Sequence, residues 1–424
     1  MPAASARRVY LDYAATAPFD ERLVDELRNA SWANANALYA EGREAASQLR
    51  DARTRIARAL GAHAPAEIVF TSGGTEADNM AVKGLAHFVP DASKTHVVVS
   101  AIEHHAVLNA ADALKAYGYK IDRVAPGKDG IVDPETLEDL LSSIEAAGDA
   151  CCLVCVQGVN NELGTIQPIA QLARVAHEHG ALFFCDAVQA LGKVALDLEA
   201  SDVDACAFSA HKIGAPKGIG ALYLRRDTRI TPLIYGGGQE AGMRSGTSNV
   251  PGACAFAQAV ESAIAEREEV WNHVSMLRSR LLDALGNGEY AHDITATLDA
   301  DAPVVPHILS LRVRGLEGET LVLRCDNAGF AISSGSACSS SSFDPSHVLM
   351  AIGLSHDDAL GGIRLSFGKG TSVEDIDRFA AAGRGPGPVD LRSDRAPSAS
   401  RWHGSAVRDL HVVADHETIC RRAS

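Results

Sequence analysis

Lys212 lies in a setting that could give a lysine chemical reactivity. The stretch 207–224 opens on a short apolar run, passes through Ser209, His211 and Lys212 into a glycine-rich loop, and ends in a second apolar run. An amine between two buried strands is poorly hydrated, so its pKa falls and its neutral form can attack a carbonyl carbon. A lone lysine in a turn is more often an ordinary surface residue. The neighbouring motifs must therefore decide whether Lys212 is reactive.

Asp186 directly follows the apolar run ALFFC. A carboxylate at the end of a buried strand is costly unless it meets a cation. The alternative is a helix N-cap, which needs no cation. Asp186 is therefore a candidate partner for a positively charged group.

The segment TSGGTE, residues 71–76, joins an expected strand to an expected helix. Backbone amides at a helix N-terminus bind phosphate, and Gly74 and Thr75 stand where such amides are expected. Many strand–helix turns look the same, so this signal is weak alone. The segment FGKG at 367–370 lacks the upstream glycine and the Ser/Thr of a P-loop, and no GxGxxG follows a strand.

Cys338 lies in SSGSACSSSS, residues 333–342, where small polar residues predict an exposed loop. An exposed cysteine on such a loop suits a nucleophile that must move, although a serine-rich linker with an incidental cysteine is the alternative. Cys152 and Cys155 form a CxxC inside an apolar strand. With no second pair, they are predicted to be core residues rather than zinc or redox ligands, and no metal site is predicted.

The bulk composition excludes several classes of protein. The 424 residues carry a net charge of −15, which disfavours binding to nucleic acid or to anionic membranes. No apolar run reaches membrane-spanning length and no signal peptide is visible. Nine scattered cysteines suit reduced thiols better than a disulfide framework. We therefore expect a cytoplasmic protein.

Strand and helix patterns alternate through the first 185 residues. Expected strands with continuous apolar runs alternate with amphipathic helices, which indicates an α/β fold with a mainly parallel sheet covered on both faces. The expected strands are 67–70, 95–100, 120–124, 150–157 and 181–185, and the expected helices are 22–30, 41–60, 77–87, 106–116, 133–147 and 169–179. Sites in such sheets lie beyond the carboxyl ends of the strands.

The pattern changes after about residue 251. One long helix over 254–285 is expected, followed by an α+β section with strands at 308–313 and 363–367 and a helix near 318–325. Thr371 and Glu374 have the spacing of a capping box at the start of a helix over 371–382. GRGPGP then interrupts the chain, and residues 383–424 have the composition of a disordered tail.

Taken together, these motifs resemble the cysteine desulfurases, which are pyridoxal phosphate (PLP) enzymes of the class V aminotransferase group. The resemblance runs from Tyr10 to about Asp377 in family order. The motifs that carry it are YLDYAATAP, EGREA, FTSGGTEADN, EHHAVL, VNNELG, DAVQALGK, FSAHKIGAPKGIGALY, GGGQEAGMRSGT, SSGSAC and IRLSFG.

The resemblance implies the PLP-dependent transferase fold of type I. Its large domain would hold a mainly parallel seven-stranded sheet, beside a smaller α+β domain. On this chain the parts would be an N-terminal segment (1–17) packing with the small domain, a PLP-binding domain (18–255), a small domain with the cysteine loop (256–382) and the tail (383–424).

The resemblance also implies a role for each matching residue. Lys212 would hold the cofactor covalently and act as a base, and Asp186 would pair with the pyridine nitrogen. His104 would stack on the ring and Gln189 would bond its hydroxyl. The phosphate would be held by Gly74, Thr75, Ser209 and His211, and by Thr247 reaching into the partner subunit of a homodimer. Asn161 and Arg364 would bind the substrate carboxylate, and Cys338 would take the sulfur as a persulfide.

The implied reaction converts L-cysteine to L-alanine and passes sulfur to an acceptor protein, either an iron–sulfur scaffold or a tRNA-thiolating enzyme. The alternatives are a selenocysteine lyase, another class V enzyme, or a PLP-binding protein that is inactive. Cys338 favours desulfuration, because transamination needs no loop thiol.

Three positions depart from the family pattern. Tyr39 replaces a histidine shortly before GRE and Asn34-Ala35 replaces Asn-Pro, while His307 replaces an asparagine. The irregular tail replaces the family's C-terminal helices, which puts the docking of the sulfur acceptor in doubt.

Overall fold

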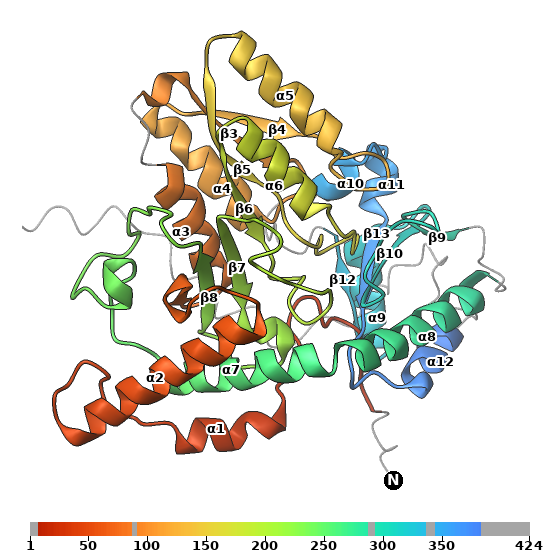
Figure 1. Cartoon of the computed structure of the whole chain (residues 1–424). Coiled ribbons are helices and arrows are strands. Elements are labelled where there is room, and N and C mark those ends of the chain that lie inside the picture. The colour runs from red at the N-terminus through yellow and green to blue at the C-terminus, as the bar shows by residue number, and fades with distance from the viewer. Residues whose placement is uncertain (1–6, 87–90, 287–292, 336–343, 383–424) are drawn as a thin grey trace, which may run out of the picture.

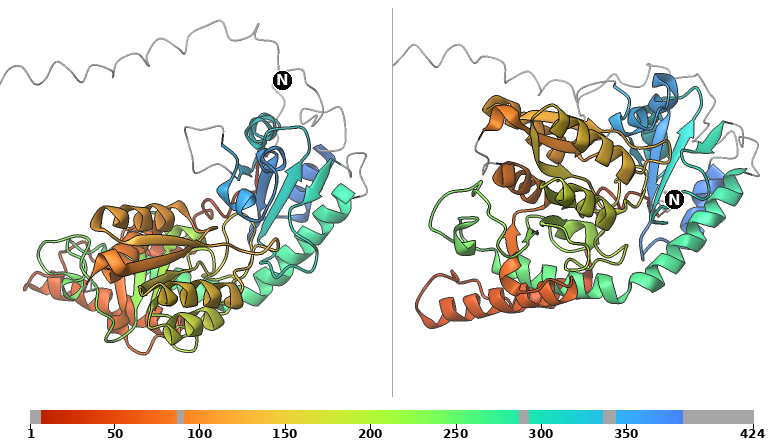
Figure 2. Two further views of the ribbon diagram at one scale, coloured as in Figure 1. Left: turned by 90° about the horizontal axis from the view of Figure 1, so that it is seen from above. Right: turned by 45° about the horizontal axis from the view of Figure 1, so that its top comes forward.

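The computed structural model describes residues 7–86, 91–286, 293–335 and 344–382. Two lobes lie side by side, one built on a seven-stranded sheet and the other on a four-stranded sheet (Figures 1 and 2). No helix in the described ranges is long and apolar enough to cross a membrane.

The large sheet has the strand order β2-β8-β7-β6-β5-β3-β4. Only β8 runs antiparallel to its neighbours, so the other strands end at one edge. The mainly parallel seven-stranded sheet is thus confirmed. Its strands are β2 (Ile68–Thr71), β3 (Thr95–Ser100), β4 (Lys120–Val124), β5 (Ala150–Cys155), β6 (Leu182–Asp186), β7 (Ala205–Ser209) and β8 (Gly220–Leu224).

Helices cover both faces of this sheet because its central strands are apolar on both sides. One core contains side chains of α2 (Ala40–Ala59), α5 (Pro134–Ala146), α6 (Ile169–Glu178) and α7 (Val250–Ala265). The opposite core contains those of α3 (Gly74–Ala86) and α4 (His105–Ala113). The short α1 (Val24–Asn29) packs on α7.

The second lobe surrounds the sheet β12-β13-β10-β9, whose strands pair antiparallel. The strands are β9 (Ile294–Ala296), β10 (Ile308–Val313), β12 (Ser333–Ser334) and β13 (Gly362–Ser366). Its core includes residues of α8 (Arg267–Gly286), α9 (Gly318–Asn327) and α12 (Val373–Ala382), while α10 (His347–Ala351) and α11 (His356–Leu360) are short. The N-terminal strand β1 (Val9–Tyr10) pairs with β11 (Phe330–Ala331) of this lobe.

Two local expectations were wrong. The helix expected over 254–285 is two helices, α7 and α8, which meet at Glu266. The capping box lies one residue later than expected, because Ser372 Oγ accepts from the Asp375 N–H and the Asp375 carboxylate accepts from the Ser372 N–H. The domain boundary at residue 255 stays a prediction and falls inside α7, and the tail 383–424 lies outside the described residues.

Glu266 belongs to an ion-pair cluster that joins three segments of the chain. Arg22 contacts Asp20 at 2.7 Å and Glu266 at 2.5 Å, and Lys369 contacts the same two carboxylates at 2.5 and 3.5 Å. The hydrogen bond from Arg22 is the main reason that the pKa of Asp20 lies below its usual value. The cluster fixes the segment before α1 to the α7–α8 junction.

Asp20→Asn should therefore lower the free energy of unfolding at neutral pH by about 1 kcal/mol, the upper value for a partly exposed ion pair. Because the folded-state pKa of Asp20 is depressed, its contribution is present above the unfolded pKa of about 3.9 and is lost as the pH falls below it. Urea unfolding at several pH values measures the difference. If the difference in the free energy of unfolding between the wild type and Asp20→Asn stayed constant below pH ~4, the charge of Asp20 would not stabilise the fold.

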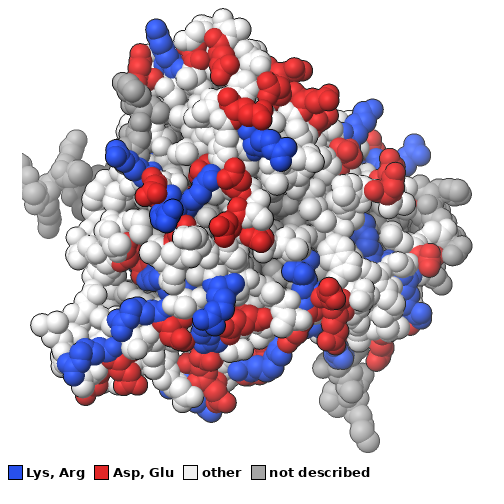
Figure 3. Space-filling model, viewed as in Figure 1, with Lys and Arg blue, Asp and Glu red and all other residues white. Residues whose placement is uncertain are grey.

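Charged side chains of both signs are spread over the face seen in Figure 3. Blue and red side chains stand next to each other there, so neither sign of charge is gathered in one patch of this face.

Candidate active site

A cavity of about 380 Å³ lies at the edge of the large sheet where the parallel strands end. It is bounded by the segments that follow β2, β3, β5, β6 and β7, and it is closed from the other lobe by β12 and β13. Of the predicted site residues that the structure describes, all except Thr247 line this cavity.

Lys212 follows β7 in a one-turn 3₁₀ helix, Ala210–Ile213. Its Nζ donates hydrogen bonds to the carbonyl oxygens of Ala14 at 2.7 Å and Ala15 at 2.9 Å. The N-terminal segment therefore orients this amine, which the sequence alone did not indicate. Gly214 ends the turn with a φ of 83°, a conformation that glycine adopts without strain.

Asp186 is the last residue of β6 and is 6% exposed. Its Oδ1 accepts a hydrogen bond from the Val188 N–H at 2.9 Å. Burial raises the pKa of Asp186 to about 6, although this hydrogen bond and the charge of Lys212 oppose the shift. A buried carboxyl with a raised pKa is stabilised in its charged form by a bound cation.

Two further buried carboxyls, Asp78 and Glu103, lie near Asp186. Asp78 is 2% exposed and Glu103 is fully buried. Burial, and then the charge of Asp186, raises the pKa of both well above the ordinary value. Burial thus favours the neutral forms of Asp78 and Glu103, whereas the charge of Lys212 favours the charged form of Asp186.

His104 and His211 are both neutral in the site. His104 caps α4, and its Nδ1 accepts from the Ala106 N–H at 3.1 Å. His211 Nδ1 lies 3.2 Å from the Thr16 hydroxyl. Burial, followed by the charge of Lys212, lowers the pKa of each ring to about 4. A neutral imidazole can stack on a ring or form a hydrogen bond, but it cannot form an ion pair with a bound anion. We therefore expect His104 and His211 to act by stacking and hydrogen bonding.

Arg364 in β13 faces the cavity from the second lobe. It donates to Asp12 Oδ1 and to the Asn161 carbonyl oxygen, both at 2.8 Å. Its Nε is buried with no hydrogen-bond partner among the described residues. The neighbouring Asn160 is buried and builds the turn by accepting from the N–H groups of Glu162 and Leu163. Of the two asparagines, Asn161 is thus the one that lines the cavity.

Three structural observations indicate that the residues lining the cavity can bind PLP. The Gln189 amide donates to the Ala14 carbonyl at 2.8 Å, but its buried Oε1 has no partner within the described ranges and could accept a ring hydroxyl. A Cβ at Gly74 would lie 2.8 Å from Val188 and 3.3 Å from Ser209, so only glycine keeps this space open. Gly74 also begins the 13-residue helix α3, whose free N-terminal amides suit a phosphate.

Two predicted site residues are not placed in the cavity. Cys338 lies outside the described residues. Thr247 is exposed in the loop before α7 and does not line the cavity of its own chain.

Sequence reasoning missed four polar residues that line or adjoin the cavity. Asp12, Asp78, Glu103 and Glu162 all lie within motifs that were already recognised. Glu162 is 7% exposed and accepts from the Ser346 hydroxyl at 2.5 Å, and burial raises its pKa to about 7. A carboxylate between apolar residues, as in Leu11-Asp12-Tyr13, is a signal that could have found Asp12, whereas the other three have polar neighbours in the sequence.

Comparison with known proteins agrees with this geometry. The model of the family described as aminotransferase class-V matches residues 9–379. The cysteine desulfurase IscS of Anaeromyxobacter dehalogenans (strain 2CP-C) is 40% identical over 375 residues, which cover 87% of this chain and 90% of that protein.

Solved structures give the same result. A NifS-like protein is 35% identical with a TM-score of 0.80, covering 88% of this chain and 97% of that one. SspA, solved in complex with cysteine, is 32% identical with a TM-score of 0.72, covering 85% and 98%. The chain therefore belongs to the class V aminotransferase family and, within it, to the cysteine desulfurases. This family depends on PLP, which the cavity fits.

Proposed function

We propose that this protein converts L-cysteine to L-alanine and holds the released sulfur as a persulfide on Cys338. The observation that carries the proposal is the cavity itself, in which Lys212, Asp186 and Arg364 come together from two lobes. Relatives named cysteine desulfurases, and a cysteine complex of a similar structure, support cysteine as the substrate.

Different residues of the chain would bind the cofactor, bind the substrate and transfer the proton. Lys212 and Asp186 would hold PLP at its aldehyde and its pyridine nitrogen, with the phosphate at the start of α3. Bound PLP supplies an electron sink for the amino acid attached to it. Arg364 binds the substrate carboxylate, because its guanidinium is held in place by Asp12 and by the Asn161 carbonyl. Lys212 then takes the proton from the substrate Cα.

Sulfur transfer needs a thiolate that can reach the substrate. Seven of the nine cysteines are in the described ranges, and each is buried or half-buried. Burial raises the pKa of Cys151, Cys152 and Cys325 to about 12, so these thiols stay protonated. This supports Cys338 as the nucleophile that attacks the substrate sulfur. As the new sulfur–sulfur bond forms, the carbon–sulfur bond breaks and its electron pair stays with the substrate Cβ, which takes up a proton to become the methyl group of alanine. The sulfur remains on Cys338 as a persulfide.

The finer parts of the proposal concern partners and location. We infer a homodimer in which Thr247 completes the phosphate site of the partner subunit, since Thr247 is exposed and lies outside its own chain's cavity. The sulfur acceptor would be an iron–sulfur scaffold or a tRNA-thiolating enzyme, and the protein would act in the cytoplasm.

The test is the fate of the sulfur atom. After brief exposure to cysteine, mass spectrometry should find one added sulfur on the peptide that contains Cys338, together with released alanine. Cys338→Ser should still bind PLP and cysteine but release neither sulfide nor alanine, because binding uses other residues.

Cys325→Ser is the matched control, since Cys325 is buried, and it should turn over cysteine normally. Sulfur found on another cysteine, or normal turnover by Cys338→Ser, would contradict this assignment. A selenocysteine lyase would prefer selenocysteine in the same assay, and an inactive PLP-binding protein would release no alanine from either substrate.

A further inference from the structure

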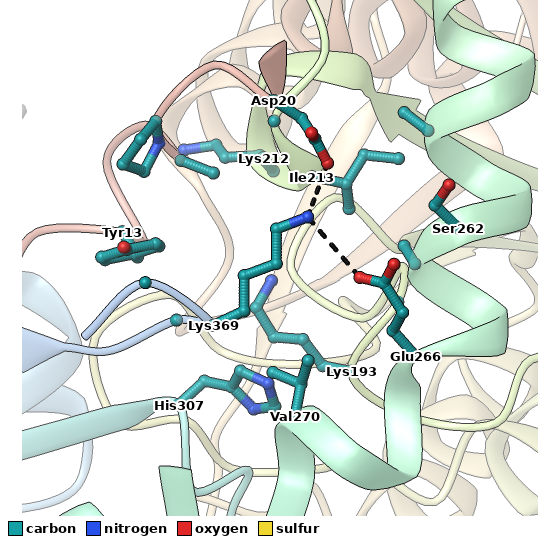
Figure 4. Close-up of a pocket in the computed structure, with 18 of the residues that line it drawn as sticks. Tyr13, Asp20, Lys193, Lys212, Ile213, Ser262, Glu266, Val270, His307 and Lys369 are labelled. Carbon is teal, nitrogen blue, oxygen red and sulfur yellow. Dashed lines mark hydrogen bonds and ion pairs between the residues drawn. The ribbon is translucent and has the colours of Figure 1, made fainter. Parts of the chain in front are cut away.

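A second cavity, of about 300 Å³, shares Lys212 as a lining residue with the cysteine site. It is enclosed by the N-terminal segment, the loop after Gln189, the α7–α8 junction and the loop after β13 (Figure 4). Its size is at the lower end of pockets that bind small molecules. Most of its wall is apolar, formed by Phe19, Leu191, Ile213, Ala259, Val270 and Phe367.

Lys193 extends its amine into this cavity (Figure 4). Within the described part of the chain, the Lys193 amine makes neither an ion pair nor a hydrogen bond. Burial, and then the charge of Lys212, lowers the pKa of Lys193 to about 7. Lys193 is half-buried, and a cation at the wall of a mostly apolar cavity is poorly hydrated, so a bound anion stabilises it.

The acids of the cavity do not supply this counter-ion. Three acids line it, Asp20, Glu21 and Glu266. Asp20 and Glu266 are engaged by Arg22 and by Lys369 in the cluster described above, and Glu21 is exposed and makes no ion pair with Lys193. Lys193 therefore has no counter-ion among the described residues that line the cavity. This unpaired amine favours an anionic ligand.

His307 provides a second, independent polar group. It is 5% exposed, and its Nδ1 is buried without a hydrogen-bond partner in the described ranges. Burial is the main reason that its pKa falls to about 3, so the ring is neutral and can donate or accept one hydrogen bond from each nitrogen. Its ring stands edge-on to Trp271, which fixes its orientation toward the cavity.

We propose that this cavity is a second ligand site, which binds a small organic anion with an apolar body. The anionic group pairs with Lys193 and the apolar body packs between Phe19, Ile213 and Val270. Because Lys212 lines both cavities, such a ligand contacts the chain beside the cysteine site without occupying it.

Octanoate is a suitable probe, because it joins a carboxylate to an apolar chain. Saturation-transfer NMR on the PLP-bound enzyme, at slightly acidic pH where Lys193 is charged, should detect its binding. The neutral 1-octanol should bind at least about tenfold more weakly, since it cannot make the charged hydrogen bond. Saturating L-alanine, which occupies the cysteine site, should not displace octanoate.

Two variants test the location. Lys193→Met keeps the length of the side chain and removes the charge, and it should weaken octanoate binding by about tenfold or more. Ser262→Phe should block the cavity while leaving Lys193 in place. Lys128→Met, at an exposed lysine far from the cavity, should bind octanoate like the wild type. Thermal melting checks that each variant is folded.

Several outcomes would overturn the proposal. These are no octanoate binding by the wild type, equal binding of 1-octanol, displacement by L-alanine, or binding that survives both Lys193→Met and Ser262→Phe. Each of these results is independent of whether the enzyme releases alanine from cysteine.

Discussion

Lys212→Ala is expected to abolish the turnover of cysteine, with a loss of more than about 10⁴-fold in kcat, the upper end of what one proton-transfer group contributes. The wild-type Nζ is held by the carbonyls of Ala14 and Ala15, in a cavity that it shares with Asp186. Removing it takes away both the covalent anchor of PLP and the base for the substrate Cα. Borohydride should fix PLP permanently to the wild type and not to Lys212→Ala.

The exposed Lys128 offers a matched control, and Lys128→Ala should keep wild-type turnover and borohydride trapping. Lys212→Arg keeps a positive charge without a usable amine, so it should fail in both assays. Trapping of PLP by Lys212→Ala would place the covalent link on another lysine and would contradict the assignment.

The large sheet was predictable because most of its strands are continuous apolar runs in the sequence. Runs such as THVVVS at 95–100 are buried at every position, and turn residues separate them from amphipathic helices. The cavity followed from the same pattern, since Asp186, Ser209 and the turn at Gly74 all stand where parallel strands end. Motif resemblance then supplied the role of each residue.

The parts that escaped prediction depend on contacts between distant segments. No glycine or proline marks the junction of α7 and α8 at Glu266, which pairs with Arg22 and Lys369 from far along the chain. The orientation of Lys212 depends on carbonyl groups some 200 residues earlier. Periodicity reports a helix or strand, but it carries no information about such partners.

Neither could the sequence reveal how the pKa values of the three buried carboxyls differ. Asp78, Glu103 and Asp186 are all acidic residues in apolar surroundings, and only their packing separates their pKa values. The second cavity could not be predicted from the sequence either. In GKVALDL, Lys193 has the pattern of an ordinary lysine, and only the fold shows that its amine lines a cavity without a counter-ion.

Asp186→Ala is expected to lower the turnover of cysteine by several orders of magnitude and to weaken the binding of PLP. Burial disfavours the charged forms of Asp78 and Glu103, while Lys212 favours that of Asp186. Asp186 is therefore the carboxylate that can keep the pyridine nitrogen protonated, and this proton makes the ring an electron sink. Asp186→Asn keeps the shape and the hydrogen bond to the Val188 N–H, so it should fold normally and lose activity almost as fully.

The pH dependence of PLP binding separates this role from that of a helix cap. Burial raises the pKa of Asp186 to about 6, so the apo protein should lose affinity for PLP as the pH falls through this value and the carboxylate is protonated. Titrating the PLP-free wild type by absorbance across this range measures the shift, and Asp186→Asn should show no such step. Near wild-type turnover in Asp186→Ala, or an unchanged step in Asp186→Asn, would reduce Asp186 to a residue that only caps the turn at Val188.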